Sequence, residues 1–347
     1  MPDSLRVCLG FPPFHASNYV ERLTALDGIE PVVLPIDEGA DWAIEHAGQP
    51  YPEPPPWAAG VASEREAALA SCHVLTTLHT PDRLAERMPN LRWVQGCGAG
   101  VEQFGNAGLD LERHVLTNCT GVSAGSMSEW VIGRLLQVWK RFREADAHQR
   151  NHAFERTYGR TFAGSTIGII GLGGIGKAVA SRARALGCRT LGVKRSAKSG
   201  DTSPDVDELF PADALTEVLS RSDAVVLSAP ATAETRHLID AKALAAMPRH
   251  AVFVNVSRGT LVDEVELARV MRDEPLAAAV LDVFDPEPPE PSNPLWDLPN
   301  VYVSAHSSVS VDRYMDDVFD LFVDNLERFR DGRELRNVVD TEALGFE

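Results

Sequence analysis

Residues 166–180 read TIGIIGLGGIGKAVA, a short apolar run that stops at the first of three spaced glycines, Gly171, Gly173 and Gly176. This pattern predicts a strand, a tight turn and a helix. Gly-x-Gly-x-x-Gly at such a junction is the dinucleotide fingerprint. The first glycine permits the turn, the second lets the backbone approach a pyrophosphate, and the third lets the helix pack on the strand. The predicted dinucleotide-binding residues are therefore Gly171, Gly173, Gly174, Ile175 and Gly176.

Two alternatives compete with the dinucleotide interpretation. The same stretch fits the beginning of a P-loop, because Lys177 follows Gly176. A P-loop continues with a Ser or Thr that ligates magnesium, whereas this chain has Ala178. A glycine-rich turn without a ligand is the second alternative. The apolar run before the turn and the helical pattern after it favour the dinucleotide.

Length, charge and cysteine content restrict the class of protein. The chain has 347 residues, which suits two domains, and a formal net charge of -17, which argues against nucleic acid or anionic membranes as partners. No apolar run has the length of a membrane helix and no signal-peptide core follows the start, so we expect a cytoplasmic protein. The five cysteines form no Cys-x-x-Cys pair, and we expect free thiols. Cys72, His73 and His79 lack the spacing of a metal site, and we predict no metal.

Short apolar, β-branched runs alternate with helical segments in two series along the chain. The first series comprises residues 5–9, 31–34, 73–78, 91–95 and 115–118. The second series begins at residue 167 and continues with 190–193, 224–227, 251–256, 277–283 and 301–304. Such alternation predicts parallel sheets, so the fold class is α/β with two doubly wound sheets.

Three further segments have recognisable patterns. Residues 123–145 predict one long helix with two broad apolar faces, buried either within its own chain or against a second subunit. Residues 311–329 predict a helix with one apolar face, and too few residues follow it for another domain, so we expect it to pack on the first sheet. The proline-rich residues 49–56 predict an extended surface loop.

Polar residues that suit carbonyl chemistry follow the last three predicted strands. Arg258, Asp282 and His306 each come at or just past the end of one strand, and ligands of parallel sheets gather at that edge. Glu287 follows Asp282 closely, and a carboxylate beside His306 would stabilise the imidazolium that delivers a proton. Arg258 offers a planar fork of donors to a carboxylate or carbonyl. Each residue alone could be structural, but together with a hydride carrier they suit carbonyl reduction.

An ordered series of motifs from about residue 74 onward resembles the D-isomer-specific 2-hydroxyacid dehydrogenase family. The matching segments are Gly98-Ala-Gly-Val-Glu102, the glycine fingerprint, Thr235-Arg-His with Leu238-Ile-Asp, Asn255-Val-Ser-Arg-Gly259, Leu281-Asp-Val-Phe, and Pro294-Leu-Trp-Asp-Leu-Pro-Asn300 before His306. The resemblance implies a Rossmann dinucleotide-binding domain over residues 121–306. It also implies a flavodoxin-like substrate domain made of residues 1–120 and 307–347.

The resemblance also implies catalytic roles. His306 matches the catalytic acid/base, Glu287 its carboxylate partner, and Arg258 the arginine that binds the carboxylate and carbonyl of the substrate. Asp282 matches the residue near the nicotinamide carboxamide, and so belongs to the predicted cofactor-binding set.

Substrate binding is predicted for a second group of residues. Gly98, Ala99 and Gly100 match the loop whose backbone N–H groups hold the substrate carboxylate, and consecutive small residues do expose such groups as an anion nest. A tight turn without a ligand remains the alternative for this loop. His79 is a further candidate, chosen from its position after a strand of the first series.

The predicted coenzyme is NADP(H) rather than NAD(H). An acidic residue usually ends the second strand and grips the adenosine ribose, whereas this chain has Lys194, Arg195 and Ser196 there. Two cations and a hydroxyl suit a 2′-phosphate, although they could equally be solvated side chains. Pro230 and Thr235 complete the predicted cofactor-binding residues.

The predicted function is reduction of a 2-oxo acid, such as glyoxylate, hydroxypyruvate or a larger relative, to the D-2-hydroxy acid, by a homodimer joined through the helix at 123–145. Within the same fold, formate dehydrogenase fits less well, because that branch has glutamine where Glu287 stands. A short phosphoglycerate dehydrogenase and a dinucleotide-sensing, corepressor-like protein remain alternatives.

Overall fold

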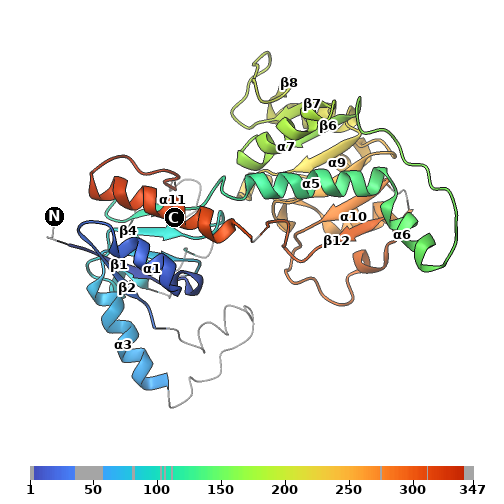
Figure 1. Ribbon diagram of the computed structural model, residues 1–347. Helices are drawn as coiled ribbons and strands as arrows, with labels where there is room; N and C mark the ends of the chain where they lie inside the picture. The colour runs from blue at the N-terminus through green and yellow to red at the C-terminus, as the bar shows by residue number, and fades with distance from the viewer. Residues whose placement is uncertain are drawn as a thin grey trace. The chain divides into compact units, whose positions relative to one another are not determined.

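The chain forms two compact units, which the computed structural model shows in Figure 1. Unit 1 consists of Met1–Val122 and Val311–Glu347, and unit 2 of Ser123–Ser310. The structure describes residues 4–35, 58–79, 83–101, 104, 107–110, 112–273, 276–310 and 312–339, so the proline-rich residues 49–56 lie outside the described part. Within that part, no helix combines the length and the apolar character needed to span a bilayer.

Unit 2 is built on a seven-stranded sheet in the order β12-β11-β10-β9-β6-β7-β8, in which all neighbours pair in parallel. Its strands are β6 Thr166–Ile170, β7 Arg189–Val193, β8 Glu208–Phe210, β9 Ala224–Leu227, β10 Val252–Asn255, β11 Ala278–Leu281 and β12 Val301–Val303. Chain order runs outward from β6 in both directions, as in a Rossmann fold, and reverses between β6 and β9. The predicted α/β class with a Rossmann sheet is confirmed.

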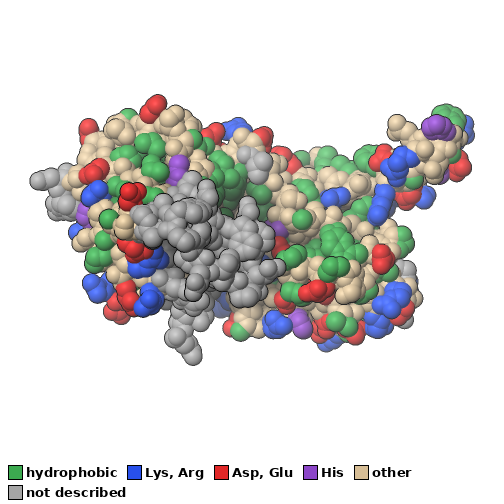
Figure 2. Space-filling view, turned by 90° about the horizontal axis from the view of Figure 1, so that it is seen from below, with side chains coloured by type: hydrophobic (Ala, Val, Ile, Leu, Met, Phe, Trp, Pro, Cys, Tyr) green, Lys and Arg blue, Asp and Glu red, His purple; other side chains and the backbone are tan. Residues whose placement is uncertain are grey.

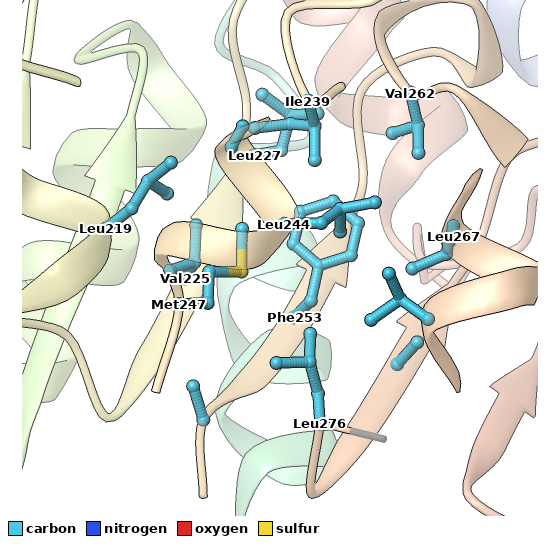
Figure 3. Close-up of a cluster of buried hydrophobic side chains, with 14 of the residues drawn as sticks. Leu219, Val225, Leu227, Ile239, Leu244, Met247, Phe253, Val262, Leu267 and Leu276 are labelled. Carbon is cyan, nitrogen blue, oxygen red and sulfur yellow. The ribbon is translucent and has the colours of Figure 1, made fainter. Parts of the chain in front are cut away.

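Helices cover both faces of this sheet (Figure 1). The helices of unit 2 are α5 Ala124–Trp139, α6 Phe142–Arg150, α7 Gly174–Ala185, α8 Leu215–Ser220, α9 Ala241–Ala246 and α10 Glu264–Asp273, with short 3-10 turns η3 Ala212–Ala214, η4 Ala233–Thr235, η5 Gly259–Leu261 and η6 Pro294–Asp297. Helices α8, α9 and α10 pack around Phe253 (Figure 3), whereas α5 and α7 pack around Ile167 and Ile169 on the other face. Successive strand residues alternate between these two cores, which explains the continuous apolar runs.

Residues 123–145 form parts of two helices, so the prediction of a single long helix is wrong. The first, α5, ends at Trp139, and α6 begins after Arg141, whose φ of 58° is left-handed. A left-handed residue cannot continue a right-handed helix, so the chain turns there. Helix α5 buries Val131 and Leu135 within its own unit, whereas none of the described side chains of α6 is buried.

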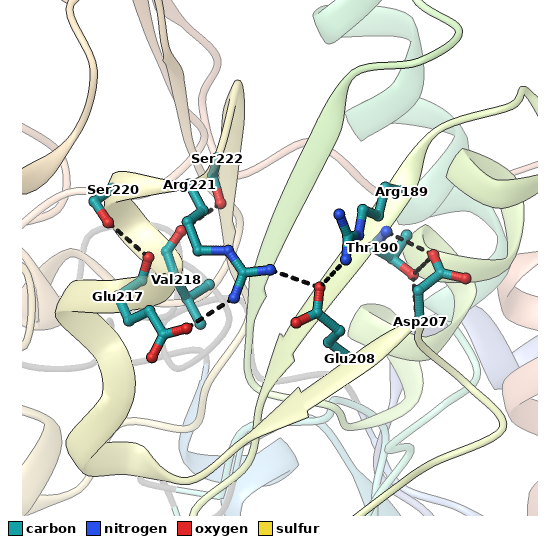
Figure 4. Close-up of polar contacts among 9 residues, drawn as sticks. All are labelled: Arg189, Thr190, Asp207, Glu208, Glu217, Val218, Ser220, Arg221 and Ser222. Atoms are coloured by element: carbon teal, nitrogen blue, oxygen red, sulfur yellow. Dashed lines mark hydrogen bonds and ion pairs between the residues drawn. The ribbon is translucent and has the colours of Figure 1, made fainter.

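The edge strand β8 has no counterpart among the predicted strands, because three residues give too short a pattern. Ion pairs hold it in place (Figure 4). The Oε1 atom of Glu208 forms ion pairs with the guanidinium groups of Arg189, at 2.5 Å, and Arg221, at 2.6 Å. Next to it, the Thr190 N–H donates to Asp207 at 2.7 Å. Charged side chains thus bind a short edge strand to its neighbours.

Unit 1 contains a five-stranded parallel sheet in the order β2-β1-β3-β4-β5, which is the flavodoxin-like order. Its elements are β1 Leu5–Leu9, η1 Pro12–His15, α1 Ser17–Thr24, β2 Ile29–Val33, α3 Ala58–Ser71, β3 Val74–Thr77, α4 Leu84–Arg87, β4 Trp93–Gly96, β5 Val115–Thr117 and α11 Tyr314–Arg330. The second predicted sheet type is therefore confirmed.

The C-terminal helix α11 returns to the first sheet, as expected from its sequence. Phe319 and Phe322 are buried in one cluster with Val7 and Trp93. A buried network of side-chain hydrogen bonds reinforces this packing. Asn325 donates to Gln95 at 3.1 Å, Thr117 donates to Gln95 at 2.8 Å, and Trp93 donates to Thr117 at 2.8 Å. The side chains of α11 thus complete the core of unit 1.

Candidate active site

Three predicted site residues of unit 2 follow three adjacent strands at the same edge of the sheet. Arg258 comes three residues after β10, Asp282 directly after β11, and His306 three residues after β12. Backbone hydrogen bonds continue past the strand ends, because Asp282 N–H donates to Asn255 O at 3.1 Å and His306 N–H donates to Asp282 O at 2.8 Å. The structure therefore places these segments side by side.

His306 and Glu287 form a direct pair. The Nδ1 atom of His306 lies 2.7 Å from Oε1 of Glu287, and both side chains are partly exposed. Because Nδ1 faces the carboxylate, the Nε2 atom is the nitrogen left for other partners. His306 has a φ of 46°, a left-handed conformation that only surrounding contacts can hold. The other Glu287 oxygen accepts the Phe284 N–H at 3.4 Å, which ties the pair to the segment after β11.

Asp282 supplies the contacts that hold the His306 loop. Its side chain is 1% exposed, and one carboxylate oxygen accepts the Ser304 hydroxyl at 2.7 Å and the Ser307 N–H at 2.9 Å. The other oxygen accepts the Ser308 N–H at 3.2 Å. Burial lowers the pKa of Arg134 on α5, and the Asp282 carboxylate opposes that effect, so a cation lies within its electrostatic range. The expected role near the nicotinamide stays a prediction, and the structure adds an anchoring role.

Arg258 extends from a turn that is fixed on both sides. The buried Asn255 donates to the Arg258 carbonyl at 3.0 Å and accepts the Ser257 N–H at 3.0 Å. The next residue, Gly259, lies so close to the Phe284 carbonyl that an added Cβ would collide with it. Arg258 is therefore bordered by the same segment that carries Glu287.

The glycine fingerprint at the end of β6 has the geometry that each glycine is expected to supply. Gly171 has a φ of 97°, and a Cβ there would lie 2.6 Å from the backbone nitrogen of Ala229. At Gly173, the N-cap of α7, an added Cβ would meet no atom within 4 Å. At Gly176 it would lie 2.0 Å from the Gly171 carbonyl oxygen. A turn, an open approach and a close helix–strand contact fit a dinucleotide pyrophosphate.

The remaining fingerprint residues begin helix α7. Gly174 is its first residue, and Ile175 packs partly buried against the core that α5 and α7 share. Backbone N–H groups at the start of this helix lack intrahelical acceptors and suit a phosphate. This arrangement favours dinucleotide binding over the bare glycine turn.

Two serines that were not among the predicted site residues join the fingerprint to the arginine turn. The Ser228 hydroxyl donates to the Gly171 carbonyl at 2.9 Å, and the Ser257 hydroxyl donates to the Ala229 carbonyl. Their places, one residue after β9 and two residues after β10, are the only sequence signal for them. They link the predicted coenzyme turn to Arg258 through neighbouring strands.

The predicted 2′-phosphate residues lie at the end of β7. Lys194, Arg195 and Ser196 are all exposed, and Lys194 and Ser196 line a cleft of about 490 Å³. Asp205 also lines this cleft, but it pairs with Lys177 at 3.0 Å, and that bond is the main cause that lowers its pKa. Asp205 is therefore engaged by Lys177, and Lys194 and Ser196 are the cation and the hydroxyl that the end of β7 contributes to this cleft.

The other predicted coenzyme residues form one compact turn after β9. The Thr235 hydroxyl donates to the Pro230 carbonyl at 2.8 Å and accepts the Thr232 N–H at 2.8 Å. A hydrogen bond from Thr232 lowers the pKa of Glu234, and the charge of Arg195 contributes to the same shift. The cationic end of β7 thus lies within electrostatic range of this turn.

The predicted substrate residues of unit 1 lie after β3 and β4. The Ala99 carbonyl accepts the side chain of Asn118 at 2.9 Å, and the Gly98 carbonyl accepts the Cys119 N–H at 2.8 Å. Both bonds engage carbonyl groups, which is compatible with an anion nest formed by N–H groups of the loop that ends at Gly100. Partial burial lowers the pKa of the His79 imidazole. The substrate roles of these residues stay predictions.

The comparisons with known proteins agree with this arrangement. Residues 132–308 match the family model of the D-isomer specific 2-hydroxyacid dehydrogenase, NAD binding domain. Relatives include glyoxylate/hydroxypyruvate reductase A of Arabidopsis thaliana, 31% identical over 74% of this chain and 81% of the relative, and glycerate dehydrogenase of Methylorubrum extorquens, 30% identical over the same shares.

A solved structure also resembles nearly the whole chain. It is the NADPH-dependent glyoxylate/hydroxypyruvate reductase of Sinorhizobium meliloti in complex with NADP and sulfate, with a TM-score of 0.78 and 27% identity over 98% of this chain and 99% of that chain. The matched family model, the relatives and the fold point to one family. The chain belongs to the D-isomer specific 2-hydroxyacid dehydrogenase family and is an NAD(P)-dependent oxidoreductase of that family.

Proposed function

We propose that this protein reduces a short 2-oxo acid, such as glyoxylate or hydroxypyruvate, to the D-2-hydroxy acid, and that it prefers NADPH. The observation that carries the proposal is the 2.7 Å contact between His306 and Glu287 at the strand edge that also holds Arg258. The relatives named as glyoxylate/hydroxypyruvate reductases support the substrate class.

Each residue has a defined task in this proposal. A bound nicotinamide coenzyme supplies the hydride for the carbonyl carbon. His306 holds the proton that the carbonyl oxygen receives, and Glu287 stabilises the imidazolium and fixes the ring. Arg258 binds the substrate carboxylate through its planar fork, which orients the carbonyl. Asp282 keeps the His306 loop in place through its three hydrogen bonds.

Steady-state oxidation of NADPH with a panel of 2-oxo acids tests the proposed reaction. The panel includes glyoxylate, hydroxypyruvate, longer 2-oxo acids and 3-phosphohydroxypyruvate, the last for the phosphoglycerate dehydrogenase alternative. His306→Gln should reduce turnover by about 10²–10⁴-fold, because a general acid contributes that factor, and should leave NADPH affinity nearly unchanged. Tight NADPH binding without turnover of any acid would instead favour the dinucleotide sensor.

The coenzyme preference rests on the end of β7. Lys194 and Arg195 carry exposed positive charge there, and the similar Sinorhizobium meliloti structure contains NADP. In the double variant Lys194→Gln/Arg195→Gln, the ratio of kcat/KM with NADPH to kcat/KM with NADH should fall at least about tenfold, because charged hydrogen bonds contribute about 1.5–3 kcal/mol. Lys242→Gln on α9 changes charge elsewhere and should leave the ratio unchanged. A wild-type protein that favours NADH would contradict this part of the proposal.

We also infer a homodimer. Phe142, Phe154 and Tyr158, in α6 and the segment after it, are large hydrophobic residues with exposures of 52%, 104% and 75%. Large exposed aromatic residues within one short segment of the chain are typical of a protein interface. Figure 2 shows one face of the molecule, on which acidic and basic side chains are interspersed with hydrophobic ones. Light scattering tests the homodimer, and the measured molar mass should be twice that of one chain. The double variant Phe154→Ala/Tyr158→Ala should dissociate the dimer, whereas Val265→Ala, which alters another exposed apolar residue, should not. The expected cytoplasmic location stays a prediction.

A further inference from the structure

The segment that carries Glu287 rests on two neighbours. On one side its backbone closes on Gly259, where no Cβ would fit beside the Phe284 carbonyl. On the other side, the Asp285 N–H donates to Oε1 of Glu264 at 2.7 Å. Glu287 holds His306 at 2.7 Å, so the placement of this pair depends on what fixes residues 284–287.

Glu264 also holds the far end of the same loop. Its Oε2 atom accepts a hydrogen bond from the side-chain amide nitrogen of Asn293 at 3.4 Å, while the side-chain oxygen Oδ1 of Asn293 accepts the Leu295 N–H at 3.0 Å and caps η6. Glu264 is the first residue of α10, a helix packed in the core of unit 2. One side chain on a fixed helix therefore joins both ends of the loop from Asp285 to Asn293.

The charge of Glu264 changes near neutral pH. Burial raises the pKa of Glu264 to about 7, and the nearby carboxylates of Asp285 and Glu287 act in the same direction, against the hydrogen bonds that favour ionisation. The positively ionisable side chains near Glu264 pair with Asp285 and Glu287. Arg236 lies 3.8 Å from Asp285, and His306 pairs with Glu287. On α10 itself, the described Glu266 side chain pairs with Arg269 at 2.8 Å.

We propose that Glu264 is a positioning residue for the His306–Glu287 pair, acting through the Asp285 backbone and through its own negative charge. This inference rests on the proposed role of His306 as the proton donor. An ionised Glu264 adds a second negative charge within electrostatic range of Glu287 and so favours the imidazolium form of His306. The negative charge of Glu264 thus extends toward higher pH the range in which His306 holds the proton needed for reduction. Glu264 itself contacts neither substrate nor coenzyme in this scheme.

Glu264→Gln separates charge from structure. The amide oxygen still accepts the Asp285 N–H, but the side chain carries no charge. We expect the basic limb of the kcat/KM profile for reduction to move about 0.5–1 pH unit lower, the effect of losing one nearby charge in a partly exposed site. Glu266→Gln removes the same charge from the same helix, where Arg269 is its partner, and should leave the limb in place.

A second readout does not depend on turnover. The imidazole signal of His306 can be titrated by NMR in the coenzyme-free protein and assigned by its loss in His306→Gln. Its midpoint should fall in Glu264→Gln by the same amount as the kinetic limb. Glu264→Asp keeps the charge but shortens the reach to Asp285, so its midpoint should stay near that of the wild type while kcat falls.

The outcomes separate this inference from the proposed function. An unchanged limb and an unchanged midpoint in Glu264→Gln would overturn the inference, even if the variant were less stable, because stability alone would indicate a purely structural residue. Normal turnover in His306→Gln would overturn the proposed function instead. If Glu264→Gln does not fold, a midpoint in Glu264→Asp that moves as far as the shift expected for Glu264→Gln would overturn the inference.

Discussion

Two alanine substitutions in the glycine fingerprint should separate coenzyme binding from folding. Gly173 and Gly176 lie three residues apart at the start of α7, yet their surroundings differ completely. A Cβ at Gly173 would point into open space, where we propose that the pyrophosphate binds. A Cβ at Gly176 would collide with the strand-side turn. We therefore expect Gly173→Ala to lose coenzyme affinity at nearly normal stability, and Gly176→Ala to lose stability.

The magnitudes follow from the local geometry. At Gly176 the added carbon would lie 2.0 Å from the Gly171 carbonyl oxygen, whereas nonbonded atoms rest about 3.5 Å apart, so two backbone segments must separate by about 1.5 Å. A collision with backbone at this distance places the cost at the upper end of the range for overpacking, about 3 kcal/mol, and the helix propensity of alanine recovers about 1 kcal/mol, which leaves a net loss of about 2 kcal/mol. For a unit of this size, Tm should fall by about 4–8 °C. At Gly173 the backbone is extended, so alanine costs at most about 1 kcal/mol as a poorer N-cap.

Calorimetry and NADPH fluorescence titration measure the two effects. We expect the Kd for NADPH of Gly173→Ala to rise at least about tenfold, equal to about 1.4 kcal/mol, because the methyl group occupies the approach path of the phosphates. Gly133→Ala on α5, where a Cβ also meets nothing within 4 Å, is the matched control and should alter neither quantity strongly. Wild-type NADPH affinity in Gly173→Ala, or a wild-type Tm in Gly176→Ala, would refute the reasoning.

Three further predictions concern stability and thiol chemistry. The pKa of Glu264 is about 7 in the folded protein and usually 4.5, so its contribution to the free energy of unfolding is full below about pH 4.5 and is lost as pH rises to about 7; urea unfolding of Glu264→Gln should show a weaker decline over that range. Asn325→Ala removes buried hydrogen bonds to Gln95 and Arg336 and should cost about 2–4 kcal/mol, measured by urea unfolding, and no loss would contradict the role given to this network. All five cysteines are buried and free, so a thiol reagent should react slowly with the native protein and reach five equivalents only after denaturation.

The sequence predicted most of the fold because apolar runs and glycine turns are local signals. The runs at residues 5–9 and 224–227 coincide with β1 and β9, and the fingerprint lies between β6 and α7 as expected. Strand β8 could not be predicted, since ion pairs to Arg189 and Arg221 hold it rather than an apolar pattern. The break between α5 and α6 depends on a single left-handed residue, Arg141, which is not a residue type that marks a helix end.

The positions of the site residues were predictable, but the contacts that hold them were not. Arg258, Asp282 and His306 could be placed from strand ends alone, because parallel strands end at one edge. The link from Glu264 to the Asp285 backbone spans 21 residues of sequence and leaves no periodic signal. The hydroxyl of Ser257 likewise bonds to a carbonyl on the neighbouring strand's loop. Such contacts depend on which strands become neighbours, and that order is a property of the folded sheet.

Two of the acidic residues after β11, Asp282 and Glu287, support His306 in different ways. Asp282 is buried, and its hydrogen bonds fix the backbone of the loop after β12, including the neighbours of His306. Glu287 is partly exposed and bonds to the imidazole itself. A buried carboxylate that accepts three hydrogen bonds is held in one position. A carboxylate near solvent can adjust its position when the imidazole ring gains or loses a proton. A loop held by Asp282 lets Glu287 respond to the protonation of His306 without moving the backbone.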